Sequence, residues 1–211
     1  MKRLLIIVLS SGLFYALVRY NIGKEVPLEH IPTYIFNKTL ALASFILFGM
    51  SYLFGKSGKI NKNNISLAAY GLAIVHLLLT ILILSPKRYP KFYDDGILNL
   101  SGEITLFAGV MAIAIFTMPF LSSVKEVGNS LFGKDYYKTF KLANWAYGFS
   151  ILHVVAMGVE GWIKTSEWPL YMPPISLIAF GSTIAVLFAR VLSFSLVREK
   201  STEIISVEEK A

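Results

Sequence analysis

Long apolar segments recur along the whole chain and limit its fold more than any other feature. They are separated by short polar turns, and they cover residues 3–20, 37–55, 65–85, 102–122, 140–162 and 174–196. A helix of about 20 apolar residues is long enough to cross a hydrocarbon core roughly 30 Å thick. The sequence therefore predicts an all-α integral membrane bundle of about six transmembrane helices.

Little sequence remains for a soluble domain, because a domain needs roughly 50 residues or more and the polar stretches are much shorter. We expect a first transmembrane helix over residues 1–20, a helical bundle over residues 35–196 and a polar cytoplasmic tail over residues 197–211. The first helix resembles an uncleaved signal anchor, since residues 14–18 are bulky where a cleavage site needs small side chains. Any flavin or nicotinamide dehydrogenase would then belong to another chain.

Composition narrows the classes of function. The chain has no cysteine, which excludes disulfides, cysteine-ligated iron–sulfur clusters and the covalent attachment of a c-type haem. The net charge is +7, and basic loops in a membrane protein serve to orient its helices. Membrane lipid is therefore the expected surrounding, and nucleic acid is not an expected partner.

Lysine and arginine are distributed unevenly between the two sets of loops. Eleven fall on the side of the termini, namely Lys2, Arg3, Lys56, Lys59, Lys62, Lys125, Lys134, Lys138, Lys141, Arg198 and Lys200. Seven fall on the other side, namely Arg19, Lys24, Lys38, Lys87, Arg88, Lys91 and Lys164. This excess predicts a multi-pass protein of the cell membrane with both termini in the cytoplasm.

Two of the three histidines lie inside apolar segments. His76 follows Ala73-Ile74-Val75 and His153 follows Ser150-Ile151-Leu152, whereas His30 lies in a polar stretch beside Glu29. An ionisable residue inside a membrane needs a partner because water is absent there, which makes it a candidate functional residue.

The two membrane histidines are expected at a similar depth. Their segments run in the same direction, and each histidine lies about 11 to 13 residues past the start of its segment, or roughly 16 to 20 Å. Two imidazoles at one level on two helices can bind the two faces of a flat macrocycle, and neutral imidazole is a good axial ligand for haem iron. We therefore predict His76 and His153 as the axial ligands of one b-type haem.

Two other interpretations of these residues stay open. Small side chains near the histidines, such as Ala73 and Ser150, leave room for a porphyrin but also favour ordinary helix packing. A transporter or channel without haem could use His76, His153 and Glu160 as a proton path. A structural or assembly membrane protein could use both histidines for packing alone.

Four segments resemble the ferric-reductase-like transmembrane domain family. They are Asn37 to Leu42, with Asn37 in place of the family's glycine; Lys62 to His76; residues 104–120 followed by Gly133-Lys134 and Tyr136-Tyr137; and Leu152-His153. The likeness covers about residues 35–195. It is greatest to the haem-binding membrane subunits of bacterial periplasmic methionine sulfoxide reductase systems.

The resemblance implies transmembrane electron transfer through haem, with the redox chemistry supplied by the cofactor. It implies a membrane subunit of an oxidoreductase that passes electrons to an acceptor outside the cytoplasm, rather than a self-sufficient enzyme. A redox partner protein, a quinol or quinone, or a bound FMN are the electron donors that such a subunit would use.

One departure from the family limits the number of haems. The family usually carries a further histidine 13 residues before the one late in the fifth apolar segment, and this sequence has Phe140 there. Phenylalanine cannot bind iron, so one haem is expected rather than two.

Charged residues near the outer boundary of the fifth segment have two interpretations each. Glu160, seven residues after His153, either influences the haem site or is simply solvated at the membrane edge. Arg88 and Lys164 lie among the aromatic side chains that belong to a membrane interface, and they could instead pair with haem propionates.

Overall fold

A computed structural model describes residues 1–53, 62–123, 125–132, 138–139, 141–189 and 192. Six of its helices are long and apolar enough to cross a membrane, and they span Lys2–Ile22, Leu28–Ser51, Asn64–Ile83, Leu100–Ser122, Leu142–Ile163 and Pro169–Ala189. The expected all-α bundle of six membrane-spanning helices is confirmed. Phe140, residues 133–137 and the tail over residues 197–211 lie outside the described part of the chain.

The first half of the chain forms three of these helices. Its elements are α1 (Lys2–Ala16), η1 (Leu17–Ile22), η2 (Leu28–His30), η3 (Ile31–Ile35), α2 (Phe36–Leu53) and α3 (Lys62–Ile83). The second half continues with η5 (Pro90–Phe92), β1 (Tyr93–Asp94), β2 (Ile97–Leu98), α4 (Leu100–Ser123), α5 (Lys125–Phe132), α6 (Leu142–Ile163), η7 (Thr165–Glu167), η8 (Pro169–Tyr171) and a last helix over residues 175–189.

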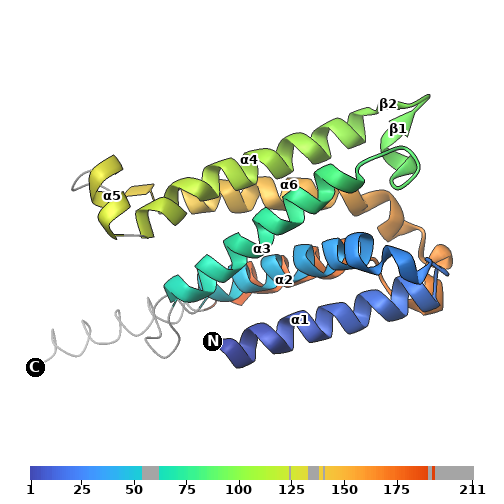
Figure 1. Cartoon of the computed structure of the whole chain (residues 1–211), viewed down its shortest axis with the longest axis horizontal. Helices are drawn as coiled ribbons and strands as arrows, with labels where there is room; N and C mark the ends of the chain where they lie inside the picture. The colour runs from blue at the N-terminus through green and yellow to red at the C-terminus, as the bar shows by residue number, and fades with distance from the viewer. Residues whose placement is uncertain (54–61, 124, 133–137, 140, 190–191, 193–211) are drawn as a thin grey trace, which may run out of the picture.

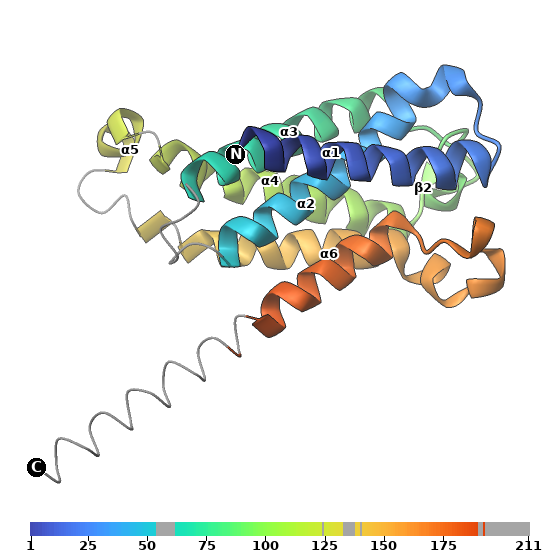
Figure 2. The same cartoon turned by 90° about the horizontal axis from the view of Figure 1, so that it is seen from below.

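The long helices lie side by side as two closely packed pairs with further helices beside them (Figures 1 and 2). α2 packs along α3 and α4 packs along α6, whereas α3 and α4 meet less extensively. α1 lies outside the pairs, against α2. Small residues at the contacts, such as Ala43 and Ala69, let the backbones approach closely.

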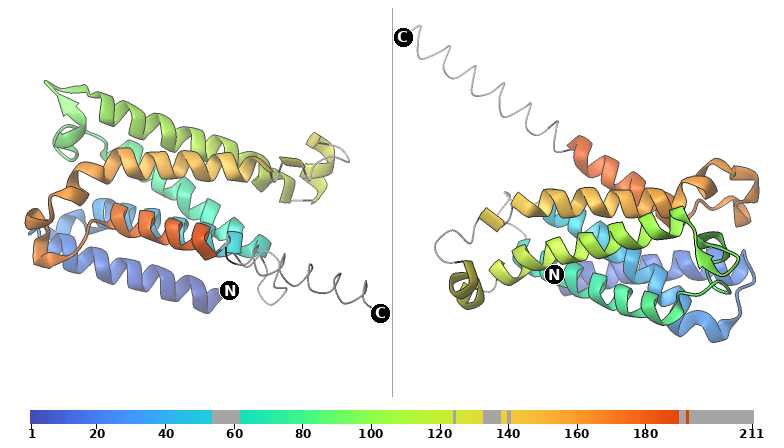
Figure 3. Two further views of the ribbon diagram at one scale, coloured as in Figure 1. Left: turned by 180° about the vertical axis from the view of Figure 1, so that it is seen from behind. Right: turned by 90° about the horizontal axis from the view of Figure 1, so that it is seen from above.

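One end of the bundle carries the β-hairpin and is called the hairpin end below. There β1 pairs with β2 in antiparallel register, with Tyr93 opposite Leu98. Asp95 and Gly96 have positive φ angles of 50° and 83°, as a two-residue hairpin turn requires. The start of α1 and the end of the last helix at residue 189 both lie towards the opposite end (Figure 3).

The second spanning helix begins earlier than the apolar pattern indicates. The pattern predicts a start at residue 37 and places His30 in a polar loop, but the helical run begins at Leu28 and includes His30 in η2. The 3₁₀ turn η2 and the π-helical turn η3 lead directly into α2. The helical run therefore extends beyond its continuously apolar part.

Candidate functional site

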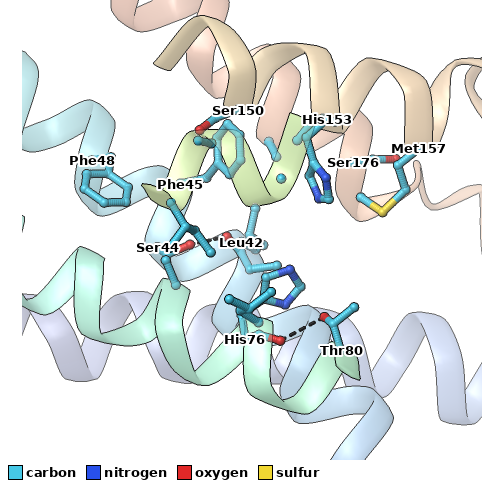
Figure 4. Close-up of a pocket in the computed structure, with 18 of the residues that line it drawn as sticks. Leu42, Ser44, Phe45, Phe48, His76, Thr80, Ser150, His153, Met157 and Ser176 are labelled. Atoms are coloured by element: carbon cyan, nitrogen blue, oxygen red, sulfur yellow. Dashed lines mark hydrogen bonds between the residues drawn. The ribbon is translucent and has the colours of Figure 1, made fainter. Parts of the chain in front are cut away.

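A cavity lies between the two helix pairs, in the middle of the bundle. It is partly open, and its volume of about 110 Å³ is below the roughly 300–1,000 Å³ that is usual for cofactor and small-molecule sites. Its walls come from α2, α3, α4, α6 and the last helix. Among the described residues that line it there is no Asp, Glu, Lys or Arg, and most are apolar. Figure 4 shows this central cavity with many of its side chains.

His76 on α3 and His153 on α6 project into the central cavity from opposite sides (Figure 4). The centres of their imidazole rings are 6.5 Å apart, and the ring planes are inclined at 77°. The structure thus brings together the two histidines that the sequence singles out. His30 lies apart from the cavity, with its Nε2 atom 3.7 Å from Oε1 of Glu29.

The Nδ1 atom of His76 faces two oxygen atoms of Asn37, the side-chain Oδ1 at 2.6 Å and the backbone oxygen at 3.1 Å. The orientation of the Asn37 amide follows from Thr80, whose Oγ1 donates its one proton to the His76 carbonyl oxygen at 2.8 Å. Thr80 Oγ1 must therefore accept from Asn37 Nδ2, which lies 3.1 Å away. Both oxygens that face His76 can only accept, so the proton of His76 sits on Nδ1.

His153 has the same proton arrangement with a simpler partner. Its Nδ1 atom lies 2.7 Å from the backbone oxygen of Thr105 on α4, which can only accept. Gly109, one turn further along α4, provides the space for the ring: a Cβ atom at this position would lie 2.8 Å from Nδ1 of His153. Such a distance is too short for real contacts, so any side chain at Gly109 would displace the imidazole.

Each histidine therefore retains an unprotonated Nε2, because a neutral imidazole carries one ring proton. Neither Nε2 atom has a hydrogen-bond partner within the part of the chain that the structure describes. Two electron-pair donors that project from opposite walls of an apolar cavity can be satisfied together by a metal ion between them.

The ring separation fits that arrangement. A metal–imidazole bond is about 2 Å long, so two imidazoles on opposite sides of one metal ion have ring centres roughly 6–6.5 Å apart. Among the described residues, no group of three or more His, Cys, Asp or Glu side chains is placed to hold a metal ion. A haem iron needs only axial ligands from the protein, and an apolar wall with small residues such as Ala73 and Ala112 suits a porphyrin. The two histidines, their spacing and the apolar wall therefore fit one haem with two axial imidazoles.

A half-buried cation lies next to Asn37. The Lys38 ammonium is 5.3 Å, 4.6 Å and 5.4 Å from the ring centres of Tyr20, Tyr34 and Tyr89, all within cation–π range. These four residues are called the Lys38 cluster below. Nδ2 of Asn37 lies 3.5 Å from the hydroxyl of Tyr89, which connects the cluster to the His76 network. No carboxylate pairs with Lys38 among the described residues.

Lys91 lies where the hairpin end meets α6. Its ammonium donates a hydrogen bond to the backbone oxygen of Met157, a residue that also lines the central cavity. Partial burial, helped by the positive charge of Lys38, lowers the pKa of Lys91 to about 8, although Glu160 opposes the shift. The ammonium group of Lys91 thus lies close to the cavity and loses its proton more easily than an ordinary lysine.

The other charged candidates lie away from the cavity. Glu160 is exposed and forms an ion pair of 2.7 Å with the exposed Lys164, four residues along the helix. Hydrogen bonding and charge from Glu160 raise the pKa of Lys164 above its ordinary value. Neither of these residues lines the cavity, and neither does Arg88. This geometry favours the solvated interpretation of Glu160.

Sequence reasoning missed Asn37, Thr105 and Gly109 as contacts of the histidines. Asn37 could have been noticed as a fully polar side chain in an apolar segment, at a position where the similar family has glycine. Thr105 acts through its backbone and Gly109 through the lack of a side chain, so neither has a signal in residue type alone.

No protein-family model matches the sequence, and no curated protein matches it. The function must therefore be inferred from the site itself.

Proposed function

We propose that this chain binds one b-type haem through His76 and His153 and carries electrons across the cell membrane. It would act as the membrane subunit of an oxidoreductase, with both termini in the cytoplasm and an electron acceptor outside. The observation that carries the proposal is the pair of unprotonated Nε2 atoms on imidazole rings 6.5 Å apart in an apolar cavity. When bound, a haem supplies one-electron redox chemistry.

The protein's part in this proposal is to hold and orient the ligands. Asn37 and the Thr105 backbone accept the Nδ1 protons of His76 and His153, which fixes each ring and makes its Nε2 a stronger donor. Gly109 leaves the space that His153 needs. The apolar wall excludes water and lowers the local dielectric, both of which influence a redox potential.

Aromatic side chains pack together on the other side of the cavity. Towards the end opposite the hairpin, Phe48 stacks on Phe116 with ring centres 4.2 Å apart, and Tyr70 stacks on Phe120 at 4.3 Å. These side chains fill the space between the helix pairs there. We propose a single haem because Phe140, which stands where the similar family has a further histidine, cannot bind iron.

The rival functions find less support in the contacts. A proton path would need titratable groups in a row, but among the described residues that line the cavity only His76, His153 and Tyr147 are titratable. Glu160 is exposed and paired with Lys164 instead. Histidines that serve packing alone would have partners for their second nitrogen atoms. The resemblance to ferric-reductase-like proteins adds support from the sequence, and a quinone or FMN as electron donor stays part of the proposal without a located site.

An absorption spectrum of the purified, dithionite-reduced protein tests the proposal. We expect a Soret band with the α and β bands of a b-type haem, and one haem per chain. His76→Ala and His153→Ala should each lose the haem, while the matched control His30→Ala should retain it. A colourless protein from cells supplied with haem, or normal spectra in both cavity variants, would show that the proposal is wrong.

A further inference from the structure

We propose that Asn37 is a positioning residue that sets the redox potential of the site through His76. This inference rests on the proposed haem function. Asn37 belongs to α2 and does not itself line the cavity, but its Oδ1 accepts the Nδ1 proton of His76 at 2.6 Å. It therefore acts on the bound iron only through the imidazole.

The two histidines differ in how their protons are held. His153 donates to a backbone oxygen, that of Thr105, whose strength as an acceptor no side-chain substitution can change greatly. His76 donates to a side chain, so the residue at position 37 decides how strongly the proton is withdrawn from the ring. The site is therefore adjustable on the His76 side alone.

Asn37 is itself fixed by a closed network. Its Nδ2 donates to Thr80 Oγ1 at 3.1 Å, and Thr80 donates on to the His76 carbonyl oxygen at 2.8 Å. Only 2% of the Asn37 surface is exposed, so water does not compete for the amide. With both side-chain atoms committed, Asn37 holds His76 in the tautomer that leaves Nε2 free.

The network also connects His76 to a positive charge. Asn37 Nδ2 lies 3.5 Å from the hydroxyl of Tyr89, and the ring of Tyr89 contacts the ammonium in the Lys38 cluster. A neutral amide next to this cation donates no negative charge to the imidazole. Asparagine thus keeps the His76 proton only moderately withdrawn, whereas a carboxylate in its place would withdraw it strongly.

The sign of the effect follows from ligand chemistry. A stronger acceptor at Nδ1 gives the imidazole more anionic character, which stabilises the ferric state and lowers the midpoint potential. Asn37→Asp should therefore lower the potential, because Thr80, Tyr89 and Lys38 can all stabilise the carboxylate. Asn37→Leu, of similar size, should raise it, because only the weaker backbone acceptor at 3.1 Å remains.

The test is a redox titration of the purified haem-loaded protein, monitored at the α band. We expect opposite shifts in the two Asn37 variants, each changing the ferric-to-ferrous ratio at fixed potential about tenfold, which is about 59 mV for one electron. Thr39→Val is the matched control, because Thr39 is buried on the same helix and bonds to the Ile35 carbonyl, but does not line the cavity. It should leave the potential unchanged. Equal potentials in wild type and both variants, or shifts of the same sign, would overturn the role of Asn37.

A second measurement does not depend on bound haem. In the protein labelled with ¹⁵N-histidine, the Nδ1 shift of His76 reports how strongly its proton is hydrogen-bonded; the bond should be strong in the wild type and weaker in Asn37→Leu, where only the backbone acceptor remains. An unchanged Nδ1 shift in Asn37→Leu would refute the positioning role even if the chain binds haem. Wild-type protein without haem would refute the proposed function, while the Nδ1 shift would still test the contact.

Discussion

The two halves of the bundle differ in whether their polar side chains are fully paired. In the half away from the hairpin, polar groups satisfy one another: Ser51 bonds to Ser66 at 2.5 Å and Tyr70 bonds to Thr117 at 2.7 Å. In the hairpin half, bonding capacity is left over on the Nε2 atoms of His76 and His153, and the half-buried cation of Lys38 has no carboxylate partner among the described residues.

This difference separates packing from function. Two hydroxyls that bond to each other stabilise helix association and leave no group for a ligand to bind. An unpaired nitrogen atom in an apolar cavity, or a cation without a carboxylate, lowers the stability of the fold. Its presence therefore indicates a functional role. Substitutions that affect His76, His153 or Lys38 in the hairpin half should therefore change cofactor binding and redox properties, while those of the paired hydroxyls in the other half should change stability alone.

The largest expected effect is at Gly109. Gly109→Val would place side-chain atoms where His153 Nδ1 now lies, since even a Cβ would be 2.8 Å away. We expect haem content to fall about tenfold or more, corresponding to roughly 1.4 kcal/mol of binding free energy. Gly71→Val on α3 is the control, because nothing lies within 4 Å of a Cβ there. Equal haem content in both variants would show that haem binding does not depend on the space that Gly109 leaves for His153.

A smaller effect is expected at Lys38. Lys38→Met would keep the length of the side chain within the Tyr20, Tyr34 and Tyr89 rings but remove a positive charge near His76. Loss of this charge should favour the ferric state and lower the midpoint potential, by about 59 mV if the ferric-to-ferrous ratio changes tenfold. Lys2→Met, at the far end of α1, should leave the redox titration unaltered. A raised potential in Lys38→Met would contradict the proposed electrostatic coupling.

Tyr70 tests the other half of the comparison. Tyr70→Phe removes the hydrogen bond to Thr117 but keeps the stacking on Phe120. Thermal unfolding in detergent should show a loss of about 1 kcal/mol, with an unchanged haem spectrum and midpoint potential. A changed potential would show that the two halves are not functionally separate.

The smallest effect is a pH dependence at Lys91. The pKa of Lys91 is lowered to about 8 from an ordinary 10.5, so the folded protein gives up this proton before the unfolded chain does. Stability should therefore rise as pH increases from about 8 to 10.5, where the unfolded state binds more protons. Lys91→Gln should lack this rise in melting temperature. A wild-type curve that parallels that of Lys91→Gln over the same range would rule out Lys91 as its source.

The sequence was sufficient to predict the spanning helices, because about 20 apolar residues in a row have few other stable arrangements. It was also sufficient to select His76 and His153 by type and depth. It could not show that Asn37 reaches His76 across α2 and α3, because that contact depends on how two helices are rotated against each other. Nor could it show that Gly109 makes room for the His153 ring by having no side chain. The early start of the second span at Leu28 was also not predicted.

The electron paramagnetic resonance spectrum of the oxidised protein, taken with its haem-to-chain ratio, tests most directly whether two imidazoles bind one iron. With ring planes inclined at 77°, two neutral axial imidazoles should give a strongly anisotropic low-spin ferric signal, at one haem per chain. A high-spin signal from iron with a single protein ligand, or a protein that takes up no haem, would contradict the account.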